Sequence, residues 1–307
     1  MSDRRIVISL AILALCAILP PLGNGYVQSV FYIAVLYVTL AYGWNIIAGY
    51  GGYLSFGQVT FFGIGAYAVA LGVTRLHLPW VLCALAGGAL AALLAVPLGY
   101  LMLRLRGAFF ALGMLGLAQT TRILTETAPF TGGSGGIYLP PGSNTLPAYY
   151  WTLAVLALAM AMTLWVDRST FGLRLRALRS DERAAGTLGV DVTRFKVVAF
   201  VLSAVVPGLL GGGYAWYLTY IDPASVFSTH VELQTVAMVI LGGVGTYWGP
   251  FVGGVLLSQL SESLGARFPQ GHLMILGGLI VAMLIALPRG IVPAVTAALA
   301  RRKTVRA

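Results

Sequence analysis

Long apolar runs separated by short polar turns fill this chain of 307 residues. Most of the runs carry no charge, and most have about the length of roughly 20 residues that an α-helix needs to cross a bilayer. The runs are residues 6–22, 26–48, 53–74, 80–103, 107–125, 149–166, 197–219, 231–265 and 271–288. This pattern predicts an all-α polytopic membrane protein.

Composition supports the same fold class. The chain is 59% hydrophobic and 9% charged, whereas soluble domains carry about 25% charged residues. Its 39 glycines would let neighbouring helices approach closely, as small residues do in membrane bundles. We therefore expect a single, tightly packed transmembrane domain over 1–307, with room for about ten crossings.

The N-terminus has the charge pattern of a secretory signal peptide. Arg4 and Arg5 precede the apolar run 6–22, but no small-residue cleavage site follows it, and Pro20 and Pro21 stand near its end. The run is therefore predicted to be a retained first crossing.

The distribution of basic residues predicts the orientation. Cytoplasmic loops of membrane proteins are enriched in Lys and Arg. If the N-terminus is cytoplasmic, six crossings return the chain to that side at the arginine-rich segment 167–196, the only long polar stretch. Every Lys and Arg except Arg75, Arg122 and Arg267 is then cytoplasmic. The net charge of +10 thus indicates a membrane-surface bias, with lipid and no nucleic acid as partner.

The run 231–265 is too long for one crossing. Its 35 residues would form a helix of about 52 Å, against a hydrocarbon core of about 30 Å. Its middle, LGGVGTYWGP at 241–250, contains glycines and a proline that do not continue a stable helix. We expect a short broken hairpin of two crossings, about 232–245 and 249–265. This gives ten crossings with both termini cytoplasmic; the alternative is ordinary glycine packing within one span.

No group of residues suggests catalysis. The sequence has no Gly-x4-Gly-Lys-Ser/Thr phosphate loop, and its two cysteines and three histidines are too scattered to predict a metal site. The nine acidic residues are each predicted to lie in a loop or near a helix end. This disfavours the alternative of an ion-gradient-driven secondary carrier of small organic solutes, which needs ionisable groups inside the bundle. A partner would then supply the energy.

A short capped helix is predicted inside 167–196. Side-chain oxygens can cap its first turn, alanines can form a small-residue face, and a glycine can end it. The residues concerned are Asp181, Glu182, Ala184, Ala185 and Gly189. Such a helix between two spans is either a docking element or a surface helix whose neighbouring arginines face lipid phosphates.

Several blocks, in order along the chain, resemble the permease family for branched-chain amino acids of ABC importers. The blocks are GWNIIAGYGGYLSFGQVTFFGIGAYAVA at 43–70, TGGSGGI at 131–137, the Ala-Ala-x3-Gly of the coupling-loop motif at 184–189, LGGVGTYWGPFVGG at 241–254 and LPRGI at 287–291. TGGSGGI resembles the LivM-type subunit. The chain departs from the family at Arg183, where the loop motif begins with Glu, and at Gly186, where a larger residue is usual.

This resemblance implies a permease subunit of the bacterial inner membrane that is not itself an enzyme. It implies four kinds of partner: a second, LivH-type permease, two cytoplasmic ATPases, an extracytoplasmic substrate-binding protein and lipid. ATP and Mg would be bound by the ATPases, and this chain would bind no cofactor. The loop near 180–190 would sit in a groove on one ATPase and couple its motion to the bundle.

Uncharged polar residues also interrupt the apolar runs. They need partners, because an unsatisfied polar group in lipid costs several kcal/mol. The residues are Asn45, Ser55, Gln58, Gln119, Thr120 and Gln234. They are candidates for lining the translocation path, and hydrogen bonding between helices is the alternative.

Overall fold

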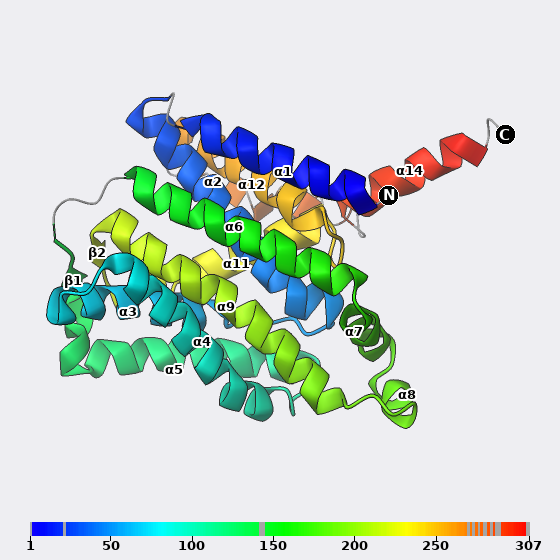
Figure 1. Cartoon of the computed structure of the whole chain (residues 1–307), viewed down its shortest axis with the longest axis horizontal. Coiled ribbons are helices and arrows are strands. Elements are labelled where there is room, and N and C mark those ends of the chain that lie inside the picture. The colour runs from blue at the N-terminus through cyan, green and yellow to red at the C-terminus, as the bar shows by residue number, and fades with distance from the viewer. Residues whose placement is uncertain are drawn as a thin grey trace.

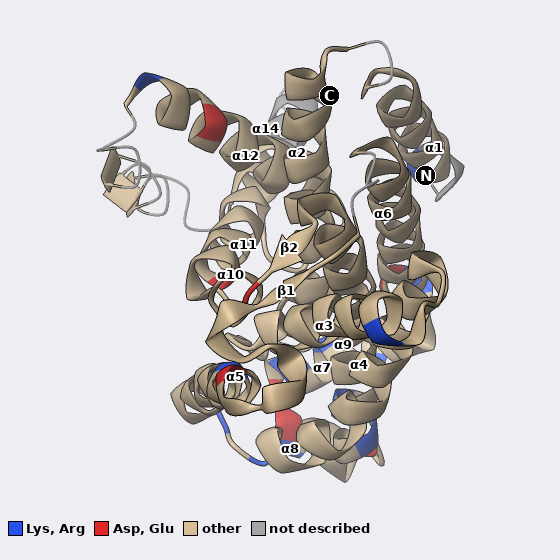
Figure 2. Cartoon of the chain, turned by 90° about the vertical axis from the view of Figure 1, so that its left-hand side faces the viewer, with Lys and Arg blue, Asp and Glu red and all other residues tan. Residues whose placement is uncertain are grey.

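The protein is a bundle of long helices with few charged residues along them (Figures 1 and 2). The computed structural model describes residues 2–20, 23–140, 145–268 and 290–304, with 271, 274, 275, 277, 278, 281, 282 and 285 in addition. Seven helical segments in this part of the chain are long and apolar enough to cross a membrane: Gly25–Tyr50, Gln58–Leu76, Trp80–Met102, Ala108–Thr127, Thr145–Arg168, Val192–Leu218 and Pro223–Gly242. The prediction of an all-α polytopic membrane fold is confirmed.

The elements follow one another as a series of helices with one small pair of strands. The first half contains α1 (Ser2–Ile18), α2 (Gly25–Trp44), the π-helix η2 (Asn45–Tyr50), α3 (Gln58–Leu76), α4 (Trp80–Met102), α5 (Ala108–Thr127), the 3-10 turns η3 (Pro129–Thr131) and η4 (Gly133–Gly135), and β1 (Ile137–Tyr138). The second half contains α6 (Thr145–Arg168), α7 (Thr170–Ser180), α8 (Glu182–Thr187), α9 (Val192–Leu218), β2 (Tyr220–Ile221), α10 (Pro223–Val226), α11 (Thr229–Gly242), α12 (Gly249–Arg267) and α14 (Ile291–Thr304).

Each predicted run between residues 26 and 219 corresponds to one of the seven segments. The seventh segment combines α10 and α11. The other crossings needed for ten fall on α1, whose apolar part Arg5–Ile18 is shorter, on α12, and on the run 271–288, most of which lies outside the described residues. The number ten therefore stays a prediction.

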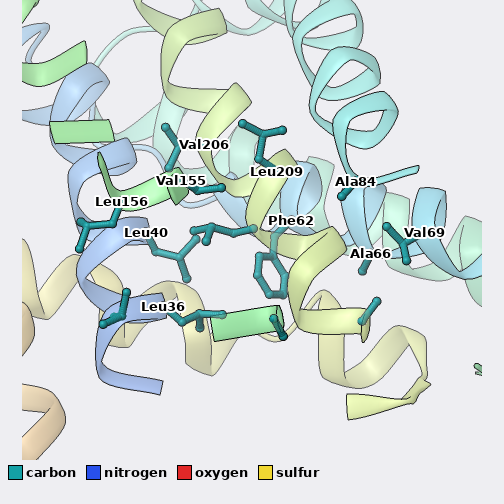
Figure 3. Close-up of a cluster of buried hydrophobic side chains, with 14 of the residues drawn as sticks. Leu36, Leu40, Phe62, Ala66, Val69, Ala84, Val155, Leu156, Val206 and Leu209 are labelled. Carbon is teal, nitrogen blue, oxygen red and sulfur yellow. The ribbon is translucent and has the colours of Figure 1, made fainter. Parts of the chain in front are cut away.

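The core of the bundle is tightly packed. Side chains from α2, α3, α4, α6 and α9 converge in it (Figure 3), and α9 lies against both α3 and α4. Glycines allow this approach: a methyl group on Gly65 would overlap the carbonyl oxygen of Gly208, and one on Gly211 would overlap that of Phe62. The close packing expected from the glycine content is confirmed.

The run 231–265 is broken where predicted. α11 ends at Gly242 and α12 begins at Gly249, with Gly243 and Gly245 at positive φ in the turn between them. The two helices pack antiparallel, because the backbone of Gly253 lies against that of Met238. The run is therefore a helical hairpin, and one continuous helix is excluded.

A second break was not predicted. The run 53–74 was expected to form a span from its start, but 51–57 is not helical and α3 begins only at Gln58. The indole Nε1 of Trp44 donates a hydrogen bond of 2.7 Å to the carbonyl oxygen of Ser55. The segment 51–57 therefore turns back alongside the end of α2, and α3 starts inside the bundle.

The segments predicted to be cytoplasmic gather at one end of the molecule. The contacts that join them are Arg5–Asp167 (2.8 Å), Ser9–Tyr247 (2.7 Å), Asn45–Gly245 (2.8 Å), Arg106–Glu182 (3.3 Å) and Arg179–Gly49. At the other end, β1 and β2 pair antiparallel with Ile137 opposite Ile221. Figure 1 shows α7 and α8 on the right and the strands on the left. This grouping agrees with the predicted alternation of turns.

Candidate coupling segment and interior polar site

Two short helices, rather than the single one predicted, occupy the polar segment. α8 is capped as expected: Asp181 Oδ1 accepts hydrogen bonds from the backbone N–H groups of Arg183 (2.9 Å) and Ala184 (3.0 Å). Gly189 follows the helix at φ 83°, a conformation that ends helices. The predicted cap and end of the helix are confirmed, and α7 is the element that the sequence analysis missed.

The small residues of α8 do not share one face. Ala184 and Gly189 are exposed, but Ala185 is only 3% exposed and belongs to a buried apolar cluster that also includes Leu178 of α7. Next to them, Leu188 is 85% exposed at the tip of the segment. Ala185 therefore fastens α8 to the bundle, while an apolar side chain that sequence reasoning did not select projects from it.

Glu182 ties α8 to three other parts of the chain. Its carboxylate accepts hydrogen bonds from Tyr53 Oη (2.9 Å), from the buried Lys196 Nζ (2.7 Å) and from Arg106 Nη2 (3.3 Å). These donors belong to the 51–57 segment, to α9 and to the turn after α4. A buried ammonium without its partner would be strongly destabilising, so this cluster holds α8 in place.

The charge of Glu182 persists into mildly acidic solution. Burial alone would raise the pKa of this carboxyl, but the hydrogen bonds from Lys196 and Tyr53, and then the charges of Lys196 and Arg106, outweigh it and lower the pKa. A carboxyl with a lowered pKa stabilises the fold at neutral pH and loses that contribution only as the pH falls through the lowered value. The link between α8 and 51–57 is therefore present at physiological pH.

A second set of contacts fixes α7 to the same region. Arg179 Nη1 donates to the carbonyl oxygen of Gly49, and its side chain lies against Gly52. Asp167, at the end of α6, pairs with Arg176 and accepts a hydrogen bond from Tyr50 Oη (3.3 Å). The segment α7–α8 therefore touches residues 49–53 through several independent side chains.

The predicted polar residues of the membrane interior divide into groups. Asn45 uses both ends of its amide to hold the turn 243–248, because Oδ1 accepts from Gly245 N (2.8 Å) and Nδ2 donates to Thr246 O (3.1 Å). Gln119 Nε2 donates to Thr229 Oγ1 (2.9 Å), which joins α5 to α11. Asn45 and Gln119 therefore form hydrogen bonds between elements, which was the alternative to lining the translocation path.

The other predicted residues have no such bonds among the described residues. Thr120 is exposed on α5, and Gln234 is buried on α11. Ser55 and Gln58 are buried, and Ser55 Oγ and both amide atoms of Gln58 lack a hydrogen-bond partner in the described part of the chain. Buried polar atoms are rarely left unpaired, so the surroundings of Gln58 are the strongest candidate for a site.

Glu232 lies beside Gln58 and was not predicted as a site residue. It is 2% exposed, and its Oε2 accepts a hydrogen bond from Val59 N (2.9 Å) at the start of α3. Its Oε1 has no partner among the described residues. The two residues share a small cavity, with room for about one water molecule, whose walls are Leu40, Gln58, Val59, Phe62, Val231, Glu232 and Thr235.

Glu232 lies near a helix end, as predicted for acidic residues outside the loops, but this helix end is buried. Glu232 is in the first turn of α11, but this turn lies inside the bundle. It is about 15 Å along the helix from Gly242, which is half of a hydrocarbon core of about 30 Å. The short length of the predicted crossing 232–245 is the sequence signal that could have revealed this depth.

Comparisons with known proteins agree with these features. Residues 26–284 match the family described as "Branched-chain amino acid transport system / permease component". Over 293 residues the chain is 30% identical to the high-affinity branched-chain amino acid transport system permease protein LivM of Salmonella typhimurium, covering 85% of this chain and 68% of that protein. It is 29% identical to LivM of Escherichia coli over the same length and shares of the two chains. It is 24% identical to LivH of Escherichia coli over 283 residues, 83% of this chain and 90% of LivH. No solved structure was found that matches the chain.

Proposed function

The chain belongs to the family of branched-chain amino acid transport permeases, and we propose that it is the LivM-type membrane subunit of an ATP-driven ABC importer for branched-chain or similar amino acids. The observation that carries this proposal is the family match over residues 26–284, a stretch that covers the seven apolar helical segments except for Gly25, the first residue of the first segment. In this assignment the chain forms half of a translocation path in the bacterial inner membrane. ATP hydrolysis, with its Mg, belongs to separate subunits.

The proposed partners are a LivH-type permease, two cytoplasmic ATPases and an extracytoplasmic substrate-binding protein. Similarity to proteins named LivM and LivH supports an importer with two kinds of permease. α5 offers the surface for the second permease, since only Phe110, Met114 and Ala118 of this helix are buried against the chain and its opposite face, with Leu112 and Thr120, is open. The path would run beside α5, near Gln58.

One uptake measurement tests this function against a gradient-driven carrier. The assembled complex is placed in liposomes with ATP inside, and the binding protein and radiolabelled leucine are added outside. We expect uptake that stops with vanadate and persists when ionophores collapse the proton and sodium gradients. Uptake that ionophores abolish, and that proceeds without ATP, would contradict the proposal.

The proposed topology has ten crossings with both termini in the cytoplasm. It is supported by the grouping of Arg5, the segment 167–191 and the turn 243–248 at one end, away from β1 and β2. Two exposed side chains mark the two ends, Leu188 and Tyr138.

Single cysteines at these two positions should label from opposite sides of the membrane. With Cys16 and Cys83 replaced by serine, Leu188→Cys is expected to react only with reagents added to the cytoplasmic side, and Tyr138→Cys only with those added outside. Impermeant maleimide on oriented vesicles makes the measurement, and detergent-opened vesicles are the control for reactivity. Labelling of both sites from the same side would rule out this orientation.

We propose further that α7–α8 couples the ATPases to the interior of the bundle. The segment bonds to residues 49–53 through Arg179 and through the Tyr53–Glu182 hydrogen bond. The chain then runs directly from Tyr53 to Ser55 and Gln58. A displacement of α8 would therefore reach the unpaired polar residues through only a few residues of non-helical chain.

Tyr53→Phe should weaken this coupling without removing the ATPases. The change deletes one hydroxyl and its 2.9 Å bond to Glu182 Oε2, so α8 keeps its bonds to Lys196 and Arg106. We expect leucine uptake per ATP hydrolysed to fall about threefold to tenfold, in line with the loss of one hydrogen bond to a charged group. Tyr100→Phe, which removes an exposed hydroxyl on α4, is the matched control. An unchanged ratio of uptake to hydrolysis in Tyr53→Phe would show that this bond transmits nothing.

A further inference from the structure

The cavity beside Glu232 presents hydrogen-bond acceptors that nothing in the described part of the chain satisfies. Glu232 Oε1 and both amide atoms of Gln58, the donor Nε2 and the acceptor Oε1, lack partners. Thr235, the third polar residue of the wall, donates its hydroxyl to Val231 O (2.8 Å), which leaves its oxygen lone pairs available. These three polar residues, one from α3 and two from α11, line one small space together with apolar side chains.

The cavity also lacks a positive charge. None of the seven described residues that line it is basic, and Glu232 forms no ion pair with any described residue. The Val59 N–H donates to Oε2 at the positive end of the α3 dipole. A carboxyl buried in this way is held in its ionised form only when a cation that donates hydrogen bonds occupies its other side.

The space and its walls limit what that cation can be. There is room for about one water molecule, and a primary ammonium head is of similar size and has three N–H donors. Leu40, Phe62 and Val231 supply apolar surface around the acceptors, a combination suited to an amine that carries an aliphatic chain.

We propose that Glu232, Gln58 and Thr235 form a binding site for the primary ammonium group of the amino acid being transported. The identity of that amino acid rests on the proposed function. The remaining atoms of the amino acid exceed the present cavity, so the site fills as the start of α11 moves away from the start of α3. The Glu232–Val59 hydrogen bond holds these two helix ends together while the site is empty.

A ligand series on the assembled complex in lipid nanodiscs tests the chemistry. Leucine, isoamylamine, isocaproate and ammonium chloride are added separately, and the unfolding temperature is followed. Binding to the folded state raises this temperature. We expect leucine and isoamylamine to raise it by about 2 °C or more, and isocaproate, which lacks the amine, to leave it unchanged. A full shift with ammonium chloride would assign the site to the free ion; a shift with isocaproate alone, or with none of the four, overturns the proposal.

Variants locate the effect at the cavity. Glu232→Gln keeps a carbonyl acceptor for the Val59 N–H but removes the charge, so the shift with isoamylamine should disappear and leucine uptake should fall at least about tenfold. The control is Thr163→Val, which removes another buried, unpaired hydroxyl on α6 and should leave both readouts unchanged. An amine shift that persists in Glu232→Gln refutes the site. If the amine shift is present in the wild type but leucine is not taken up, the site stands and the assignment as a leucine importer fails.

Discussion

Leu188→Glu is expected to separate the ATPases from an otherwise intact permease. Leu188 is 85% exposed at the tip of α8, beside the exposed Ala184 and Gly189, at the end of the molecule proposed to be cytoplasmic. If this tip enters a groove on an ATPase, the leucine is the apolar anchor of the contact, and a charge there would be desolvated without a partner. Co-purification of the ATPases and leucine uptake should each fall at least about tenfold.

The side chain at 188 can be changed without disturbing the fold, because it makes little contact with the chain. Leu188 differs in this respect from Ala185, which is buried. A charge at Ala185 would unfold α8 itself. Leu76→Glu provides the matched control, since Leu76 is also highly exposed but lies at the C-terminal end of α3, away from α8. Wild-type retention of the ATPases by Leu188→Glu would remove the tip of α8 from the docking surface.

Gly65→Ala and Gly211→Ala should each destabilise the bundle strongly. A methyl group at either position would overlap backbone carbonyl oxygen, that of Gly208 or that of Phe62, and backbone in a packed core cannot move aside as a side-chain end can. Overpacking of this kind costs about 1–3 kcal/mol. We expect a clear decrease in the unfolding temperature of each purified variant, followed by intrinsic tryptophan fluorescence.

Gly265→Ala shows what the same change does where there is space. Nothing lies within 4 Å of a methyl group placed on Gly265 in α12, so the alanine should stabilise the helix by up to about 1 kcal/mol. If Gly265→Ala lowered the unfolding temperature as much as Gly65→Ala, the effect of Gly65→Ala could not be assigned to overlap between α3 and α9.

The apolar runs, the hairpin break and the cap of α8 could be predicted because each depends on local chemistry. Uninterrupted apolar residues predict helices in lipid. The glycines and proline of 241–250 end helix α11. The carboxylate of Asp181 accepts hydrogen bonds from free N–H groups at the start of helix α8. The location of the polar residues could be predicted too, but not their roles. Asn45 and Gln58 look alike in sequence, yet both ends of the Asn45 amide form hydrogen bonds and neither end of the Gln58 amide has a partner among the described residues.

The features that could not be predicted depend on contacts between distant parts of the chain. Hydropathy shows that 51–57 is largely apolar, but it does not show that the backbone there is not helical. The sequence places Glu232 near a helix end, but only the hydrogen bond from Val59 N shows that this end is buried. Tyr53 and Glu182 are 129 residues apart, and no local pattern connects them. Ala185 shows a further limit, because a small residue suits a docking face and an inward-packed face equally.

The π-helix Asn45–Tyr50 constrains how the gene for such a chain can change in length. A π-turn accommodates one more residue than an α-turn over the same rise, and here it ends a helix whose side chain at 45 must meet Gly245 and Thr246. Deletion of one codon between 46 and 50 would let α2 continue as a regular α-helix, but would rotate all that follows by about 100°. Arg179 could then no longer reach Gly49. Point substitutions in this turn should therefore be far better tolerated than single-codon insertions or deletions.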